Sequence, residues 1–431
     1  MDGPQPQRVS CNVNLDYISN LPADLKEKIL VKLPVKEAVK TSILSSKWKD
    51  AWTSIRSLVF EENSPEYMTI RLVDNVLIFH LGPILEFRLV SEHACNEAIS
   101  RWMLILSRNK IRYLDLRFNG HERCKIPSRL FSCLALERVI LSECIINVPQ
   151  SFQGFKLLHT LSLSSFNLSG ITTIANLVSG CPLLERLRLY FFVQQGCLHI
   201  IAPNLRDLHI LGECHDLCLE TPKLVSGCIY LNISNGDHKK FLIANSRKES
   251  NIKKALGCLP NIQELHIDAE FIDYLAMGPI SENPPTIFNC LTEISLAVYC
   301  SDREEIAAAL CLFKSAPILN VLNIEFLDWR GEDQLQGQPF WKLKATKDFL
   351  FKCLQTLNIM YLQDTNLSSR RDESMLEFAE LVLGIAPVLE KLKIIDYEDP
   401  TVYRTKLDCF PKLSEKAEFV FVQRSEDGDL V

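Results

Sequence analysis

An apolar pattern of six residues recurs between residues 111 and 394, with hydrophobic side chains at its first, fourth and sixth positions. Its last two apolar positions are separated by one polar position, which is the period of a strand that buries one face. Copies start at Ile111, Leu136, Leu158, Leu184, Leu205, Ile262, Leu291, Leu319, Leu354 and Leu389. A weaker copy starts at Leu224 and has Gly227 at its fourth position. The pattern predicts a series of short strands that share one buried side.

The segments between these strands carry signals of helices and of chain breaks. Apolar residues at helical spacing precede several copies, for example Ile99, Trp102 and Leu106 before the first. A proline ends the preceding segment two positions before six of the copies, at Pro182, Pro203, Pro222, Pro260, Pro317 and Pro387. Units of this kind cannot bury a face alone, so neighbouring units must stack. The expected fold is therefore α/β, a curved solenoid with a parallel sheet on its concave side.

The repeat intervals resemble those of leucine-rich repeats. Successive copies up to residue 224 start 25, 22, 26, 21 and 19 residues apart, close to the ~20–29 residues of that family. Three residues after the last apolar position, where the family carries a polar ladder, the first two copies have Asn119 and Cys144. The next two have Phe166 and Phe192. We therefore expect part of the ladder to be replaced by apolar packing.

A gap of 38 residues separates the copies that start at Leu224 and Ile262. Residues 232–254 within it are polar and basic, and we expect a mobile surface segment there in place of a regular repeat. We interpret its lysines at positions 239, 240, 253 and 254 as a solvated charge run in preference to a nuclear import signal.

The amino-terminal part contains a second apolar pattern, from residue 21 to residue 52. Pro22 suits the first turn of a helix, and Pro34 ends that helix. A second helix is expected over residues 35–44, followed by a short turn that carries Trp48 and Trp52. Three short helices in ~40 residues are too few to support a core. An exposed aliphatic face of this size indicates a docking surface for a partner.

The order of residues in this segment resembles an F-box. The matching features are Leu-Pro at 21–22, Ile-Leu at 29–30, Leu-Pro at 33–34, Ala-Val at 38–39 and Ser-Ile-Leu-Ser at 42–45 before Trp48. F-box segments dock onto a Skp-type adaptor, which is tied to cullin and RING subunits, so the resemblance implies a subunit of a ubiquitin ligase. The alternative is a set of ordinary core helices. The residues assigned to the adaptor contact are Leu21, Pro22, Leu25, Ile29, Leu30, Leu33, Pro34, Val39, Leu44 and Trp48.

The carboxyl-terminal part resembles the FBD domain that follows F-box and leucine-rich segments in many plant proteins. The resemblance rests on CLQTLNI from residue 353, ESMLEFAELVLGIAP from residue 373, VLEKLKI from residue 388 and the strand-like AEFVFV from Ala417 to Val422. The alternative is that these are the last solenoid units, with residues 417–422 as a closing strand. The expected division is an F-box at 15–60, a solenoid at 61–345 and FBD-like repeats with a cap at 346–425.

Composition and missing motifs narrow the function. A net charge of −6 gives no general attraction to nucleic acid or to an anionic membrane, and neither partner is expected. The first residues do not resemble a secretion signal, so we expect the cytoplasm or the nucleus and 16 reduced cysteines. The chain lacks phosphate-loop, zinc-protease and nucleophile-elbow motifs. No catalytic residue, cofactor or metal is expected, and His209, Cys214, His215 and Cys218 are interpreted as unligated.

The strand positions that flank the buried residues define a client-binding candidate. In the first four copies these positions are weighted toward arginine and tyrosine, with an acidic residue at Asp115. Arginine and tyrosine are enriched among binding hot spots, and the client-binding candidates are Tyr113, Arg117, Arg138, Arg186, Arg188 and Tyr190. Later copies carry acidic residues there, and the last copy carries Lys391 and Lys393. We expect the first half to receive an acidic or phosphorylated client segment and the middle a basic one. The alternative is a face of solvated charges without a ligand.

These features predict the substrate-recognition subunit of a cullin-RING ubiquitin ligase. The F-box would hold the adaptor, the repeats would hold a client protein, and the chain would perform no bond chemistry itself. The rival interpretation is a repeat scaffold that binds the adaptor without delivering clients for ubiquitination. A hormone receptor with an inositol-phosphate floor fits less well, because the basic side chains are few and scattered.

Overall fold

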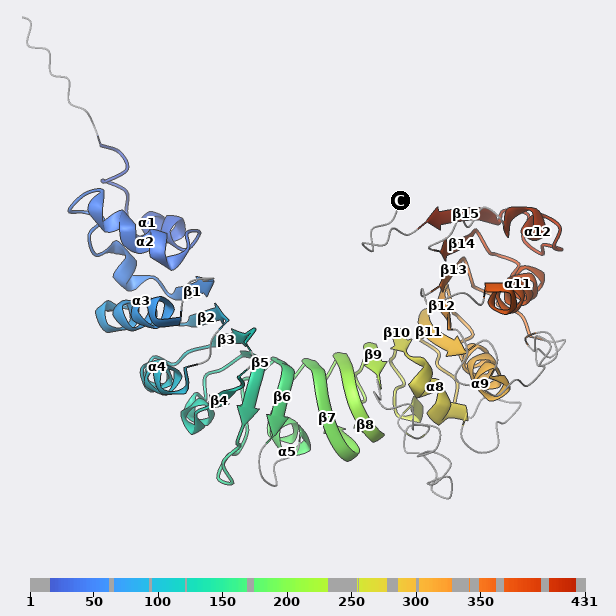
Figure 1. Ribbon diagram of the computed structural model, residues 1–431, viewed down its shortest axis with the longest axis horizontal. Coiled ribbons are helices and arrows are strands. Elements are labelled where there is room, and N and C mark those ends of the chain that lie inside the picture. Colours follow the sequence, from blue (N-terminus) through green and yellow to red (C-terminus); the bar gives the residue numbers. More distant parts are fainter. Residues whose placement is uncertain are drawn as a thin grey trace, which may run out of the picture. The chain divides into compact units, whose positions relative to one another are not determined.

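The computed structural model describes residues 16–61, 66–92, 95–120, 122–168, 174–231, 254, 256–276, 286–299, 302–327, 341, 349–361, 368–396 and 403–423. The chain divides into two compact units, residues 1–136 and 137–431, and each is described by itself. Both combine helices with parallel strands (Figure 1). None of the described helices is both long enough and apolar enough to cross a membrane.

The first unit begins with short helices that follow two prolines. Helix α1 spans Ala23–Leu30 and helix α2 spans Val35–Lys40. The carbonyls of Pro22 and Pro34 accept the first helical hydrogen bonds, so each proline sits at the helix start. The α-helix ends at Lys40, four residues before the predicted end, and continues as the 3₁₀ turn η1 (Thr41–Ile43). The hydroxyls of Thr41 and Ser42 donate to the Ala38 and Val39 carbonyls, and such bonds compete with helical ones.

Three parallel strands and the short strand β4 (Cys124–Ile126) complete the first unit. The three parallel strands are β1 (Ser57–Glu61), β2 (Glu86–Ser91) and β3 (Tyr113–Phe118), with β2 between the other two. Helices α3 (Glu66–Phe79) and α4 (Asn96–Arg108) connect them. The six-residue pattern therefore starts near residue 55, before the first copy recognised in the sequence at Ile111 and shortly before the expected start of the solenoid at residue 61. The six-residue pattern is in fact present twice more, as Ile55, Leu58 and Phe60 and as Ile84, Phe87 and Leu89, all buried.

The second unit continues with the same type of sheet. Each described strand from β5 onward pairs in parallel with the next one, including β9 with β10. The strands are β5 (Arg138–Ile146), β6 (Thr160–Leu168), β7 (Arg186–Ile201), β8 (Asp207–Glu220), β9 (Ser226–Tyr230), β10 (Glu264–Ile267), β11 (Glu293–Tyr299), β12 (Val321–Leu327), β13 (Thr356–Tyr361), β14 (Lys391–Asp396) and β15 (Glu418–Gln423). The predicted parallel sheet of stacked repeats is confirmed.

Helices cover one side of this sheet (Figure 1): α5 (Ile174–Ser179), α8 (Ala269–Ala276), α9 (Arg303–Lys314), α11 (Ser368–Ile385) and α12 (Arg404–Asp408). Burial alternates along the strands, so the repeated apolar residues lie in the core and the intervening ones form the opposite side, here called the open face. Rings fill the core between helices and strands, for example Phe378 with Phe313 and Phe326 at 6.2 and 5.9 Å between centroids. Each buried Leu, Ile or Phe contributes roughly 1.5–3 kcal/mol.

The expected replacement of the polar ladder is found in β5, β6 and β7. Cys144, Phe166 and Phe192 are buried at that position, and the rings of Phe166 and Phe192 stack at 5.8 Å. Asn119, which we placed in the same ladder, is exposed instead. Strand β3 ends at Phe118, which is buried. The Asn119 amide still donates to the Ser91 carbonyl of β2 at 3.1 Å, but its side chain faces solvent.

The carboxyl-terminal strand closes the sheet as predicted for residues 417–422. Strand β15 pairs with β14 along its length, Leu392 opposite Phe419 and Ile394 opposite Phe421. The Lys412 ammonium lies 4.0 Å from the centre of the Phe419 ring. The segment predicted to be mobile, residues 232–253, lies outside the described residues, and Lys254 belongs to a short helical stretch.

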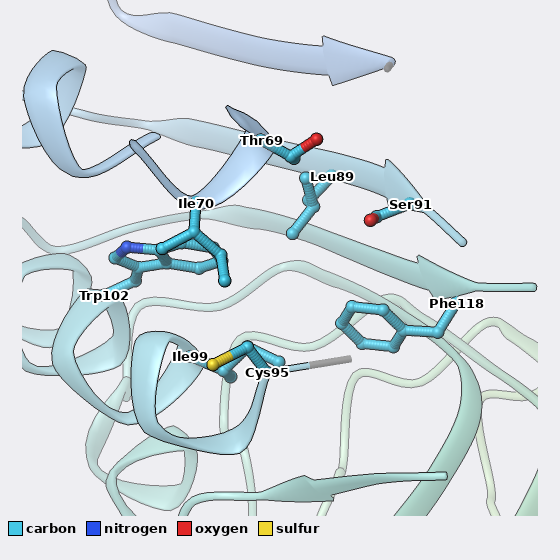
Figure 2. A pocket seen from close by; sticks show the side chains of 8 residues that line it. All are labelled: Thr69, Ile70, Leu89, Ser91, Cys95, Ile99, Trp102 and Phe118. Atoms are coloured by element: carbon cyan, nitrogen blue, oxygen red, sulfur yellow. The ribbon is translucent and has the colours of Figure 1, made fainter. Parts of the chain in front are cut away.

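A small cavity lies in the core of the first unit, between α3, α4 and the strands β2 and β3. Figure 2 shows its lining, which includes Thr69, Ser91 and Phe118. The cavity has a volume of about 10 Å³, which is the space of a single water molecule. It is too small to bind a substrate or a cofactor.

Candidate adaptor-docking and client-binding surfaces

Eight large apolar side chains are exposed on the helical segment that precedes β1. Ile43 and Leu44 are 87% and 67% accessible, although both are among the most hydrophobic residue types. The full set, here called the apolar docking face, is Tyr17, Ile18, Leu25, Ile29, Val31, Leu33, Ile43 and Leu44. A monomeric soluble protein rarely leaves so many apolar side chains together in water. The face therefore has the character of a protein-binding surface.

The side chains beneath this face hold the short helices together. Leu30, Ala38, Trp48 and Trp52 are buried. The Trp48 indole donates to the Ile18 carbonyl at 3.2 Å, and the Lys26 ammonium lies 5.5 Å from the centre of its ring. Two buried tryptophans thus supply most of the packing that a segment of this size can offer.

This arrangement changes two of the predicted adaptor contacts. Leu30 is fully buried and Trp48 is 3% accessible, so we assign both to internal packing. Leu21 and Val39 are half-buried, while Pro22 and Pro34 are exposed. The others, Leu25, Ile29, Leu33 and Leu44, lie on the apolar docking face.

Four members of the docking face were missing from the sequence-based set: Tyr17, Ile18, Val31 and Ile43. A signal existed for Ile43, which stands in the Ser-Ile-Leu-Ser run beside Leu44. Tyr17 and Ile18 precede the first helix, where no periodicity applies. Their place follows from the Trp48 indole, whose bond to the Ile18 backbone holds this segment against the helices.

The predicted client-binding residues Tyr113 and Arg117 lie on β3 in the first unit. The Arg117 guanidinium donates two hydrogen bonds to Asp115, at 2.8 and 2.9 Å. Arg88 on β2 lies 3.5 Å from Asp115 and 3.1 Å from Glu61. The charges on this part of the open face therefore largely neutralise one another, which sequence positions alone did not indicate.

The other predicted client residues lie in the second unit. The Arg188 guanidinium is 3.3 Å from Asp207, and His209 Nε2 is 3.0 Å from the same carboxylate. Burial lowers the pKa of His209, and Asp207 opposes that shift. Burial likewise raises the pKa of the half-buried Tyr190. Arg186 is exposed, and its side chain makes no hydrogen bond or ion pair with any described residue, so its guanidinium is available to a ligand.

Amide side chains, more than charges, organise the later strands. Asn323 on β12 donates to Glu293 at 3.0 Å and to Ser295 at 2.8 Å, and Asn358 on β13 donates to Asn323 at 2.7 Å. Asp268, expected as a charge on the open face, accepts a bond from the Phe271 amide at the start of α8. The acidic middle that we predicted is therefore weaker than its composition suggested.

One group of carboxyl side chains in the described part of the chain is close enough to hold a metal ion. Oxygen atoms of Asp273, Asp302 and Glu305 lie within 4.8 Å of one another. Asp302 caps helix α9 by accepting from the Glu304 and Glu305 amides, and Glu305 accepts from the Tyr299 amide at 3.0 Å. Glu305 also shares a side-chain hydrogen bond with Asp273, and burial is the main cause that raises its pKa. Protonation and helix capping explain this group without a metal.

The shared proton predicts a dependence of stability on pH. Because the folded-state pKa of Glu305 is raised above its ordinary value of 4.5, the folded chain keeps a proton that the unfolded chain loses. Stability should therefore fall as the pH rises from about 5 towards 8, by up to about 1.4 kcal/mol per pH unit. Urea titrations at pH 6 and pH 8 should show this decline in the native chain and a flatter profile for Glu305→Gln. The exposed neighbour Glu304→Gln is the control, and an equal decline in all three chains would contradict the shared proton.

The cysteines of the described residues are free thiols. Burial raises the pKa of Cys133 to about 11 and that of Cys214 to about 12, which makes them unreactive. His209, Cys214 and Cys218 do not come together as a ligand group among the described residues.

A helical segment with an uncovered apolar face, followed by stacked parallel repeats, defines an F-box protein of the leucine-rich-repeat class. A family model of the F-box domain matches residues 18–60, and the model of the leucine-rich repeats of FBD-associated F-box protein At5g56370 matches residues 99–324. The chain is 33% identical to F-box/FBD/LRR-repeat protein At1g13570 of Arabidopsis thaliana, over 95% of this chain and 99% of that protein. It is 28% identical to F-box/FBD/LRR-repeat protein At3g52680 of the same plant, over 75% and 74% of the two chains. The chain belongs to the F-box/FBD/LRR-repeat family.

Proposed function

We propose that this chain is the substrate-recognition subunit of an SCF-type cullin-RING ubiquitin ligase, working in the cytoplasm or the nucleus. The observation that carries the proposal is the apolar docking face, whose exposed hydrophobic side chains, all except Tyr17, lie on the part of the chain that matches an F-box. F-box domains generally bind Skp-type adaptors, which connect them to cullin and RING subunits.

The proposed mechanism is positional. The docking face holds the adaptor, and the open face of the repeats holds a client protein, so that a client lysine remains near the charged ubiquitin-conjugating enzyme. Such tethering raises the local concentration of the reacting groups. The chain itself needs no catalytic residue, because the bond chemistry belongs to the enzymes that it brings together.

The open face supports a client with acidic segments. Arg138 and Arg186 occupy the same row of the sheet, with Thr160 of the intervening strand between them. Neighbouring strands lie ~4.8 Å apart, so the two arginines originate ~10 Å from each other. Guanidinium groups at this spacing suit two carboxylates of one extended segment.

Charge reversal at these arginines tests the client-binding role. We expect Arg138→Glu, Arg186→Glu and Arg188→Glu together to reduce client capture by about tenfold or more, because attraction becomes repulsion. Proteins that co-purify with the tagged chain and its adaptor from proteasome-inhibited plant cells should be quantified by mass spectrometry. Lys391→Glu with Lys393→Glu, on the last repeat, is the matched control. Unchanged capture by the triple variant would remove the arginines from the proposal.

Turnover separates a ligase receptor from a scaffold that binds the adaptor without delivering clients. A receptor requires that a captured protein carry ubiquitin chains and live longer when the docking face is disabled. A scaffold leaves both properties unchanged. Measuring the half-life of each captured protein with the native chain and with Leu44→Asp therefore decides between the two functions.

A further inference from the structure

Strand β7 contains an exposed aromatic residue in a backbone conformation that disfavours it. Phe191 has a φ of +51° and is 64% accessible. Large side chains seldom adopt this left-handed conformation, which glycine and asparagine tolerate best. Residues held in such conformations cluster at functional sites, because selection for stability alone would replace them.

The same conformation recurs at the equivalent place in the two preceding strands. Glu143 on β5 and Ser165 on β6 have φ values of +52° and +47°. Each stands immediately before the buried residue of the replaced ladder, Phe166 in β6 and Phe192 in β7. The left-handed conformation is thus a feature of the repeat. In β5 and β6 the residue that adopts it is polar. A phenylalanine at this position of β7 is unexplained by the fold.

Strand β8 has no counterpart for Phe191. Tyr190 pairs with Leu211 and Phe192 pairs with Gly212, so Phe191 is an extra residue that bulges from the sheet. Phe192 stacks on Phe166 inside the core. The residues directly before and after Phe192 therefore carry side chains that point to solvent. Val193 on the other side of Phe192 is 72% accessible. Two exposed apolar side chains therefore flank one buried anchor.

The same strand begins with the available guanidinium of Arg186, five residues before Phe191. Strands rise ~3.3 Å per residue, so the charge and the aromatic ring originate ~16 Å apart. Tyr190 and Arg188 lie between them on the open face. Strand β7 thus presents a cationic residue at its start and exposed apolar residues near its middle.

We propose that β7 recognises an extended acidic segment of a client protein, whose carboxylates meet Arg186 and Arg138 and whose large apolar side chain packs on Phe191 and Val193. The inference deepens the proposed client-binding role and rests on it. The positive charge at one end selects carboxylates, and the exposed ring supplies a rigid aromatic contact of the kind that dominates binding energy. The distance along β7 sets the spacing between the two determinants at about five residues.

Synthetic peptides test this site without knowledge of the client. Fluorescent peptides should carry a Glu-Glu pair followed by Leu after three to six Ser or Gly residues, and their binding to the full chain with its adaptor should be measured by anisotropy. We expect these peptides to bind about tenfold more tightly than versions with Lys-Lys for Glu-Glu or Ser for Leu, with an optimum near a separation of five residues. Absence of any preference for the Glu-Glu and Leu peptides would overturn the proposal.

Phe191→Asn separates recognition from folding. Asparagine tolerates the left-handed conformation, so the variant should melt at the same or a higher temperature while binding the Glu-Glu and Leu peptide about tenfold more weakly. Ser165→Gly is the matched control, since it relieves the same conformation on β6 and should leave binding unchanged. If Phe191→Asn binds the peptide as the native chain does, Phe191 is not part of a recognition site.

The outcomes distinguish this inference from the proposed function. Loss of client capture in the triple arginine variant, with peptide binding insensitive to Phe191, would leave the ligase role standing and remove the β7 site. Peptide binding at β7 in a chain that fails to bind any Skp-type adaptor would leave the β7 site standing and remove the ligase role.

Discussion

Replacing Ile43 and Leu44 together with aspartate should abolish binding of a Skp-type adaptor without unfolding the protein. Both side chains are largely exposed, so their removal leaves no cavity in the core. Aspartate would place two charges within an apolar interface, where each unpaired charge costs several kcal/mol. We expect at least about a hundredfold weaker binding, which surface plasmon resonance with immobilised adaptor would measure.

Two controls make the result specific. Ile78→Asp, on helix α3 outside the F-box match, changes a side chain that is 68% accessible, almost the same as Leu44, and should leave adaptor binding intact. Trp48→Ala should also weaken binding, but through loss of the packing beneath the face, so it should lower the melting temperature as well. Native affinity in the Ile43 and Leu44 double variant would show that the apolar docking face is not the adaptor site.

The sequence predicted the type of fold because the repeats carry buried apolar residues at the same positions of the six-residue pattern. The strands found at β1 and β2 follow that pattern too, with Ile55, Leu58 and Phe60 in the first. They were therefore predictable from the same pattern, although they directly follow the F-box segment. Parallel pairing was also predictable, since successive copies of the pattern start roughly 20–29 residues apart, which leaves room for a crossover that returns the chain to the same edge of the sheet.

Side-chain pairing could not be read in the same way. Asp207 reaches Arg188 because β7 and β8 align with a particular register, and register depends on the length and packing of the arm between them. Ile29 and Leu30 are adjacent and equally apolar, yet Leu30 faces inward and Ile29 outward. That choice depends on which side of α1 packs against Ala51–Ser54, which lie more than twenty positions further along the chain.

Backbone conformation was the least predictable level. Phenylalanine carries no preference for positive φ, so nothing in the sequence marked Phe191 as a bulge. Its conformation is imposed by the repeat, which forces Glu143, Ser165 and Phe191 into the same turn. The disfavoured conformation of Phe191 therefore becomes apparent only when equivalent positions of the repeats are compared in the structure.

Among the described glycines of the second unit, Gly154 leaves the least room for a side chain. We therefore expect a substitution there to have the largest effect on stability. Gly154 has a φ of +91°, and a Cβ atom there would lie 1.8 Å from the Gly180 carbonyl oxygen. A Cβ on Gly180 would in turn lie 2.6 Å from the Gly154 Cα. The two glycines belong to the arms of successive repeats, one before β6 and one between α5 and β7. Any side chain at either position must push these arms apart.

We therefore expect Gly154→Ala to reduce the free energy of unfolding by about 4 kcal/mol or more, a loss that single substitutions seldom cause. Two other glycines of the same unit separate the contributions. Gly196→Ala meets no atom within 4 Å but has a φ of +86°, so it should cost only the conformational strain, about 1–2 kcal/mol. Gly384→Ala, in helix α11 with no atom within 4 Å, should stabilise by up to about 1 kcal/mol. Urea denaturation followed by circular dichroism would rank the three variants. A Gly154→Ala chain no less stable than Gly196→Ala would show that the two arms do not pack against each other, because the contact, and not the positive φ alone, is what makes the first substitution severe.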